Sequence, residues 1–173
     1  TSVIFKTNDH KQGHTHLVDS LLSLGVNIIK VFSPEHGFRG NIDAGEKVAD
    51  GVDPSTGIAI VSLYGNQRKP SPESLQNIDL VLFDIQDVGV RFYTYIATLQ
   101  LVMQACGAAN IPLFILDRPN PNSHYVDGPT MEKAHQSFLG MTPIPLVYGM
   151  TIGEYASMVN TEEGWLGTEK HPA

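Results

Sequence analysis

The chain has 173 residues, 42% of them hydrophobic, a single cysteine and a formal net charge of −7 at pH 7. This length fits one globular domain, and the negative charge argues against the basic surface that nucleic-acid binding requires. No apolar run approaches the roughly 20 residues of a membrane-spanning helix, and one cysteine excludes an internal disulfide.

The first half of the chain alternates between helical and strand-like patterns. Leucines at near-helical spacing predict a helix over residues 15–25, which closes on a glycine. The apolar run 26–32 predicts a buried strand, and residues 41–57, rich in Asp and Gly, predict a loop. A second strand is predicted over 58–65. A short helix follows over 71–77, with a serine as its N-cap.

The second half repeats this alternation. Residues 78–84 are nearly all apolar and predict a third strand, and the helical pattern of 92–109 follows it. Residues 111–117 predict a fourth strand, and 151–160 predict a closing helix. Residues 120–149 between them are rich in Pro, Gly and His, with little periodicity. Long connections of this kind in compact domains are usually functional or disordered.

Apolar strands separated by helices indicate an α/β fold. We predict a Rossmann-like parallel sheet with helices on both faces, formed by residues 1–173 as one domain. Cys106 lies in an apolar helical pattern and is expected to be a packed core thiol. The chain begins at Thr1 without an initiator methionine and stops just after a helical stretch, so we expect a piece of a larger protein.

Polar side chains collect where three of the predicted strands end. Ligands of an open parallel sheet bind beyond the carboxyl ends of its strands. We therefore expect one crevice to be rimmed by the residues that follow these ends: Glu35, His36, Asp84, Gln86, Asp87, Arg91, Asp117, Arg118 and Asn120. The alternative is local scaffolding, in which Asp84 and Asp117 cap turns and Arg91 and Arg118 are their charge partners.

The stretch FSPEHGFRG after the first of these strands contains several ionisable side chains close together in sequence. Glu35, His36 and Arg39 fall within five residues, and glycines lie on both sides of Phe38 and Arg39. Asn, Ser and Gly would suffice for a loop that only had to turn. This composition favours a functional loop.

The chain also contains a histidine cluster and several aromatic residues outside the acid-bearing loop. His10, His14 and His16 resemble a metal site, but neither a helix nor a strand frames them and carboxylate companions are few, so no metal is predicted. Tyr64 and the RFYTY stretch offer rings with an apolar face and a hydroxyl, which suits a sugar ligand. Paired carboxylates with aromatic walls suit glycoside cleavage.

The ordered motifs of the chain resemble a known family, the NamZ-type exo-β-N-acetylmuramidases. The resemblance covers residues from about 19 to 165 and is carried by SPEHGFRG, DAGE, SLYG, KPSPE, FDIQDVGVRFYTY, LDRPNP, DGP, SFLG and YGMTIGEYA. It implies a Rossmann-like domain followed by a smaller C-terminal domain, with the active cleft between them. The chain is expected to lack that second domain and also the first strand of the sheet.

The resemblance also implies an activity and a location. Family members release N-acetylmuramic acid from the non-reducing end of peptidoglycan fragments, so muramyl saccharides are the expected partners and no cofactor is expected. They are typically exported, which implies a periplasmic or secreted protein. Two alternatives stay open: a metal-assisted hydrolase that uses Asp84, Asp87 and Asp117, and a cell-wall-binding module without turnover.

Residue roles follow from the same resemblance. Glu35, beside His36, is the expected catalytic acid, and the second carboxylate is Glu132, Asp87 or Asp117. A guanidinium binds a carboxylate as a bidentate fork, so Arg91 or Arg118 would hold the lactyl carboxylate of muramic acid. The remaining expected substrate contacts are Arg39, Asp84, Gln86, Tyr93 and Asn120. Inverting, covalent and substrate-assisted routes all remain open.

Overall fold

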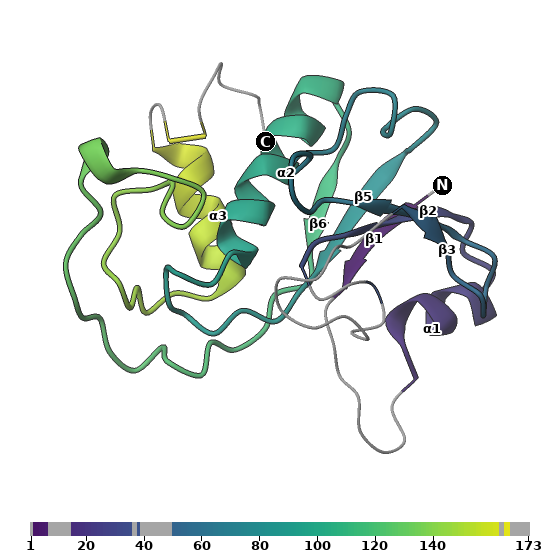
Figure 1. Cartoon of the computed structure of the whole chain (residues 1–173). Helices are drawn as coiled ribbons and strands as arrows, with labels where there is room; N and C mark the ends of the chain where they lie inside the picture. Colours follow the sequence, from purple (N-terminus) through teal and green to yellow (C-terminus); the bar gives the residue numbers. More distant parts are fainter. Residues whose placement is uncertain (1, 7–14, 36–37, 39–49, 163–164, 167–173) are drawn as a thin grey trace. The chain divides into compact units, whose positions relative to one another are not determined.

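The structure is a computed structural model that describes residues 2–6 (backbone), 15–35, 38, 50–162 and 165–166 (Figure 1). The chain divides into two compact units. The first unit, here called the sheet unit, comprises residues 1–85 and 105–114, and the second, the loop unit, comprises 86–104 and 115–173. Each unit is described by itself.

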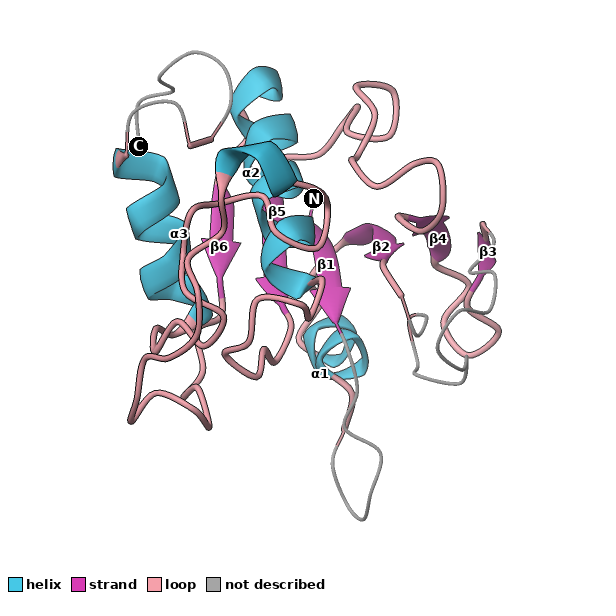
Figure 2. Cartoon of the chain, turned by 60° about the vertical axis from the view of Figure 1, so that its left-hand side comes forward, coloured by secondary structure: helices cyan, strands magenta, loops and turns pink. Residues whose placement is uncertain are grey.

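The strands form one six-stranded sheet in the order β3-β4-β2-β1-β5-β6, which can be followed across Figure 2. The strands are β1 (Ser2–Lys6), β2 (Ile28–Ser33), β3 (Gly51–Val52), β4 (Ala59–Ser62), β5 (Leu80–Asp84) and β6 (Leu113–Ile115). β1 pairs in parallel with β2 and β5, and β2 pairs in parallel with β4. The predicted α/β fold with a largely parallel sheet is confirmed.

The central strand of the sheet corrects one expectation. We expected the sheet to lack its first strand, but Ser2–Lys6 forms β1, with Ser2 opposite both Ile28 and Leu80. That expectation was wrong. Five residues between polar neighbours give too short an apolar run to be distinguished from a loop by pattern alone.

Two further differences concern the strands at the sheet margins. β3 lies inside the predicted loop and pairs with β4 in antiparallel fashion, because Asp53 N–H donates to Ile58 O (2.8 Å) and Gly57 takes a φ of 74° in the turn. β6 covers only three of the residues predicted for the fourth strand. Phe114, at its middle, is exposed.

Three α-helices lie at predicted positions, with later starts: α1 (Leu17–Ser23), α2 (Tyr95–Ala109) and α3 (Ile152–Thr161). α1 begins at His16, whose side chain accepts a hydrogen bond from Val18 N–H. α3 begins with a capping box, in which Thr151 and Glu154 each accept from the other's backbone N–H.

The predicted helix over 71–77 is wrong. Only a single turn forms there, with Leu75 N–H donating to Ser71 O and Ser74 N–H donating to Ser71 Oγ. Ser71 therefore does cap a turn, but the stretch has too few apolar positions to extend that turn into a packed helix. A 3₁₀ turn, η1 (Lys133–His135), occurs in the long segment without predicted structure.

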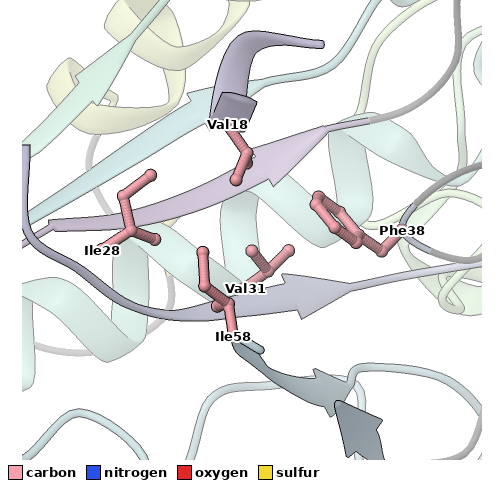
Figure 3. Close-up of a cluster of buried hydrophobic side chains, with 5 residues drawn as sticks. All are labelled: Val18, Ile28, Val31, Phe38 and Ile58. Atoms are coloured by element: carbon pink, nitrogen blue, oxygen red, sulfur yellow. The ribbon is translucent and has the colours of Figure 1, made fainter. Parts of the chain in front are cut away.

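The core of the sheet unit includes a cluster of buried apolar side chains, shown in Figure 3: Val18, Ile28, Val31, Phe38 and Ile58. Val18 from α1 and Val31 from β2 are completely buried. Half-buried leucines of α1 pack against the same cluster. α1 therefore covers this face of the sheet because its apolar side faces β2.

The cysteine prediction is confirmed. Cys106 on α2 is 2% exposed, and burial raises the pKa of its thiol to about 12. The thiolate, which is the reactive form, is therefore disfavoured at neutral pH. The residue is part of the packing.

Candidate active site

The carboxyl edge of the sheet brings two of the predicted acids to one side of the sheet unit. Glu35 follows β2 and Asp84 ends β5, and both strands run parallel to β1. Glu35 is half-buried, whereas Asp84 and the neighbouring strand residue Ser33 are completely buried. β2 and β5 lie on opposite sides of β1, so the chain order reverses there, and ligands of open α/β sheets bind at such a point.

Phe38, three residues after Glu35, is a buried aromatic residue. Phe38 is 4% exposed and points into the core cluster beside Val18 and Val31 (Figure 3). Its ring also meets the His16 ring edge-on, with centroids 4.7 Å apart. Burying this phenyl group restrains the backbone on which Glu35 lies. The predicted residues His36 and Arg39 lie outside the described residues.

Asp87, in the loop unit, lies in a buried polar network. Its Oδ2 accepts hydrogen bonds from Gly89 N–H (2.8 Å) and from the Tyr148 hydroxyl. Its Oδ1 is buried and has no hydrogen-bond partner in the described part of the chain. Burial raises the pKa of Asp87, and the hydrogen bonds from Tyr148 and from backbone amides partly oppose that shift. A carboxyl group with a raised pKa retains its proton to higher pH.

The network continues from Tyr148 into α2 and α3. The rings of Tyr148 and Tyr155 lie 6.0 Å apart. The Tyr155 hydroxyl donates to Gln100 Oε1 (3.2 Å) and lies 3.1 Å from Thr142 Oγ1. Burial raises the pKa of Tyr155 to about 12 and also raises that of Tyr148. Both phenols are therefore neutral hydrogen-bonding groups over the physiological range.

Sequence reasoning did not select this set of tyrosines. Tyr148 and Tyr155 belong to the YGMTIGEYA motif, which was used only as evidence of resemblance. The available signal was a pair of phenol-bearing residues at otherwise apolar positions around the start of a helix. Buried tyrosines usually find a hydrogen-bond partner, and here the partner is Asp87 for one and Gln100 for the other.

Two of the predicted substrate contacts bond to main-chain groups within the loop unit. Gln86 Nε2 donates to Asp87 O (2.7 Å) and Pro119 O (3.1 Å). Asn120 Nδ2 donates to Met150 O (2.9 Å), and its side chain lies so close to Gly89 that a Cβ there would be 2.3 Å from it. These amides tie together loops that are distant in sequence.

Arg91 has a similar structural position. It is 8% exposed, and its Nη1 donates to Pro129 O (2.9 Å) and to Ile144 O. The guanidinium therefore satisfies main-chain carbonyls of the long segment 120–149. The scaffolding alternative holds for these contacts, although the expected partner was an aspartate rather than the backbone.

Asp117 binds the start of α3. Its carboxylate accepts from Thr151 Oγ1 (2.7 Å) and Gly153 N–H (2.9 Å), and a negative charge at a helix N-terminus is favourable. The Arg118 N–H also donates to it (3.0 Å), while the Arg118 side chain is half-buried. The Asp117 carboxylate therefore caps the N-terminus of α3, whereas the scaffolding alternative predicted that it would cap a turn.

Two predicted residues lie on the surface of the loop unit. The side chain of Glu132 is 79% exposed and lies 3.9 Å from His135. Tyr93 is 45% exposed, with its ring beside those of Phe92 and Tyr95. Whether any of the predicted residues acts on a substrate stays a prediction.

The described residues were also compared with the requirements of a metal site and of a membrane-spanning helix. No group of three or more His, Cys, Asp or Glu side chains there is arranged to hold a metal ion. Of the histidine cluster, His16 caps α1, while His10 and His14 lie outside the described residues. None of the helices in the described ranges is both long and apolar enough to cross a bilayer.

The fold and the acid-bearing loop at the carboxyl edge define an α/β protein with a candidate active site at a strand end. A family profile described as "Exo-beta-N-acetylmuramidase NamZ, N-terminal" matches residues 2–170. The chain belongs to this family. It is 49% identical over 138 residues to the peptidoglycan β-N-acetylmuramidase NamZ of Bacillus subtilis strain 168, which covers 79% of this chain and 33% of that protein.

Solved structures agree with this assignment. Two DUF1343-family proteins from Bacteroides fragilis superpose with TM-scores of 0.83 and 0.82, at 46% and 37% sequence identity. The first match covers 96% of this chain and 43% of the other, and the second covers 92% and 40%. The chain thus spans less than half the length of these relatives.

Proposed function

We propose that the protein is a glycoside hydrolase that releases N-acetylmuramic acid from the non-reducing end of peptidoglycan fragments. The 49% identity to a Bacillus protein named as a peptidoglycan β-N-acetylmuramidase carries the proposal. The position of Glu35 supports it, because this carboxyl group follows β2 at the edge where open sheets bind ligands.

Glu35 is the proposed general acid. Cleavage of a glycosidic bond requires a carboxylic acid that protonates the departing oxygen while positive charge develops at the anomeric carbon. Phe38, buried three residues later, holds the loop against the core. A general acid must be held close to the departing oxygen, and Glu35 directly follows the last residues of β2.

The second carboxylate is proposed from three candidates with different surroundings. Asp87 is buried, and burial raises its pKa. Asp117 already accepts hydrogen bonds at the start of α3, and Glu132 is largely exposed. A carboxylate that must stabilise positive charge has to be ionised, so the raised pKa of Asp87 fits proton donation better than charge stabilisation.

Substrate binding and location complete the proposal. Muramic acid carries a lactyl carboxylate, which a guanidinium binds in a bidentate manner. Arg91 and Arg118 are the two candidates, and the guanidinium of Arg91 already donates to two main-chain carbonyls. Peptidoglycan lies outside the cytoplasmic membrane, so a periplasmic or secreted location is proposed with this substrate.

The test is product analysis on defined disaccharides. The protein produced from its whole reading frame is incubated with N-acetylmuramyl-β-1,4-N-acetylglucosamine. The reversed disaccharide, with N-acetylglucosamine at its non-reducing end, is the matched control. Release of free N-acetylmuramic acid from the first substrate alone is the expected result.

Other outcomes separate the alternatives. Equal cleavage of both disaccharides, or cleavage of neither, contradicts the proposed activity. Binding of the muramyl disaccharide without cleavage would favour a cell-wall-binding module. Loss of cleavage after dialysis against a chelator, with recovery on adding a divalent cation, would favour the metal-assisted hydrolase.

A further inference from the structure

The turn before α2 carries two adjacent aromatic side chains that this chain leaves exposed. Phe92 is 54% exposed and Tyr93 is 45% exposed. Their ring centroids are 5.9 Å apart with an interplanar angle of 49°, and Tyr93 meets Tyr95 at 6.5 Å and 62°. Apolar rings that remain in water contribute little to folding stability, so a cluster of them indicates a contact surface.

The backbone beneath these rings is held by hydrogen bonds. Arg91 N–H donates to Leu146 O (2.8 Å), and Tyr93 N–H donates to Val90 O (3.1 Å). The buried Arg91 guanidinium donates to Pro129 O (2.9 Å), and α2 begins at Tyr95. The two exposed rings therefore project from a fixed segment, and a surface fixed before binding loses less entropy when a ligand arrives.

We propose that Phe92 and Tyr93 form an aromatic platform on which one pyranose ring of the saccharide substrate stacks. A pyranose has an apolar face of C–H groups and a rim of hydroxyls. A tyrosine ring offers a matching apolar face, and its hydroxyl can pair with a sugar hydroxyl. This inference rests on the proposed function, because that function supplies the saccharide.

The size of the platform favours a sugar over a protein partner. Stable protein–protein interfaces bury about 800 Å² on each partner and involve about 20–30 residues a side. Three neighbouring rings are far fewer residues than such an interface involves. Tyr125, another exposed aromatic residue in the described part of the chain, differs from this arrangement, since its ring lies beside that of His124.

The test compares steady-state kinetics of single variants of the whole protein with the muramyl disaccharide as substrate. Tyr93→Ala is expected to raise KM about tenfold with kcat within about twofold of wild type, since loss of one stacking contact weakens substrate binding by roughly that factor. Phe92→Ala is expected to raise KM less. Tyr93→Phe, which keeps the ring, should remain within about threefold of wild type.

Tyr125→Ala is the matched control, because Tyr125 is 41% exposed and also contacts one neighbouring ring. Its KM should equal that of wild type. Melting temperatures of all variants are measured in parallel. An unchanged KM in Tyr93→Ala overturns the platform, and so does a fall in kcat without a change in KM. A change of oligomeric state in Tyr93→Ala with constant KM also overturns it and assigns the rings to a protein contact.

The platform and the proposed function fail in distinguishable ways. If wild type releases no N-acetylmuramic acid, the proposed function fails whatever the variants do. Calorimetric titration of wild type and Tyr93→Ala with the uncleaved disaccharide then tests the platform alone. Weaker binding by the variant supports the platform, and equal dissociation constants, or no binding by either protein, overturn it.

Discussion

Both units of the molecule bury apolar side chains, but they differ in how they use polar side chains. The sheet unit consists of regular strands and a helix around buried apolar side chains such as Val18 and Val31. In the loop unit, side chains such as Arg91, Asn120 and Gln86 bond to main-chain carbonyls of other loops. The comparison shows that a polar residue after a strand can act as a structural tie where regular hydrogen bonding is scarce.

This difference changes how candidate catalytic residues are ranked. In the sheet unit the backbone is paired along the strands, and Glu35 follows β2 beyond that pairing. In the loop unit, Asp117 and Asn120 have local hydrogen-bond partners that account for their presence. Substitutions at these residues separate a catalytic role from a structural one.

Glu35→Gln should reduce release of N-acetylmuramic acid by about 10²–10⁴-fold, the usual contribution of general acid catalysis. Glutamine keeps the size of the side chain but cannot donate a carboxylic proton. Stability should change little, because Glu35 is only half-buried. Turnover is measured with the muramyl disaccharide, and thermal unfolding is the control. Turnover within a few-fold of wild type would exclude Glu35 as the acid.

Arg91→Met should affect stability rather than turnover. It should lower the free energy of unfolding by about 3 kcal/mol. The change removes two hydrogen bonds made by a charged group that is 8% exposed, those to Pro129 O and Ile144 O, while Ile144 O keeps its bond from Met131 N–H. Chemical denaturation measures the loss. Arg68→Met is the control, since Arg68 donates to Gly65 O in an exposed position and its loss should cost about 0.5 kcal/mol or less. A fully stable Arg91→Met protein with a raised KM would instead assign Arg91 to the substrate.

Asp87→Asn should change the free energy of unfolding less than Arg91→Met does, and by an amount that depends on pH. Asparagine Oδ1 can still accept from Gly89 N–H and the Tyr148 hydroxyl, so the change should stay below about 2 kcal/mol. Because burial raises the folded-state pKa of Asp87 above its usual 3.8, wild-type stability falls as pH rises through the raised value. The variant lacks this loss of stability. Its free energy of unfolding, relative to that of wild type, should therefore be higher above that pH than below it.

The measurement is the free energy of unfolding of both proteins from pH 3 upward. Glu132→Gln is the matched control, because it removes the same charge at a position that is 79% exposed. Its difference from wild type should stay nearly constant over the range. A constant difference for Asp87→Asn as well would contradict the effect of burial on this carboxyl group.

The sequence predicted the sheet unit better than the loop unit, for a physical reason. Apolar periodicity reports local burial, and it located α1, β2 and β5 together with the carboxylates that follow two of those strands. It did not locate β1, whose position depends on pairing with strands far along the chain. Strand pairing is a property of the whole fold rather than of a short window.

The loop unit was harder to predict because its contacts are distant in sequence. The carbonyl partners of Arg91 belong to Pro129 and Ile144, and Tyr148 pairs with Asp87. Residue type alone made Arg91 and Asp87 look like binding or catalytic groups. Only the fold shows that their hydrogen bonds lie within the unit, and the roles assigned to them through family resemblance stay predictions.

The central place of β1 has a consequence for synthesis on the ribosome. Along the chain β1 precedes both of its partners: it pairs with β2 on one side and waits for β5, whose last residue is Asp84, on the other. Its second edge therefore stays open while the intervening chain is made, and open strand edges invite wrong partners. Completion of the sheet requires pairing between distant residues, which is intrinsically slow. This edge of the nascent chain is thus exposed to wrong pairing until β5 emerges, and a chaperone that holds β1 would protect it during that interval.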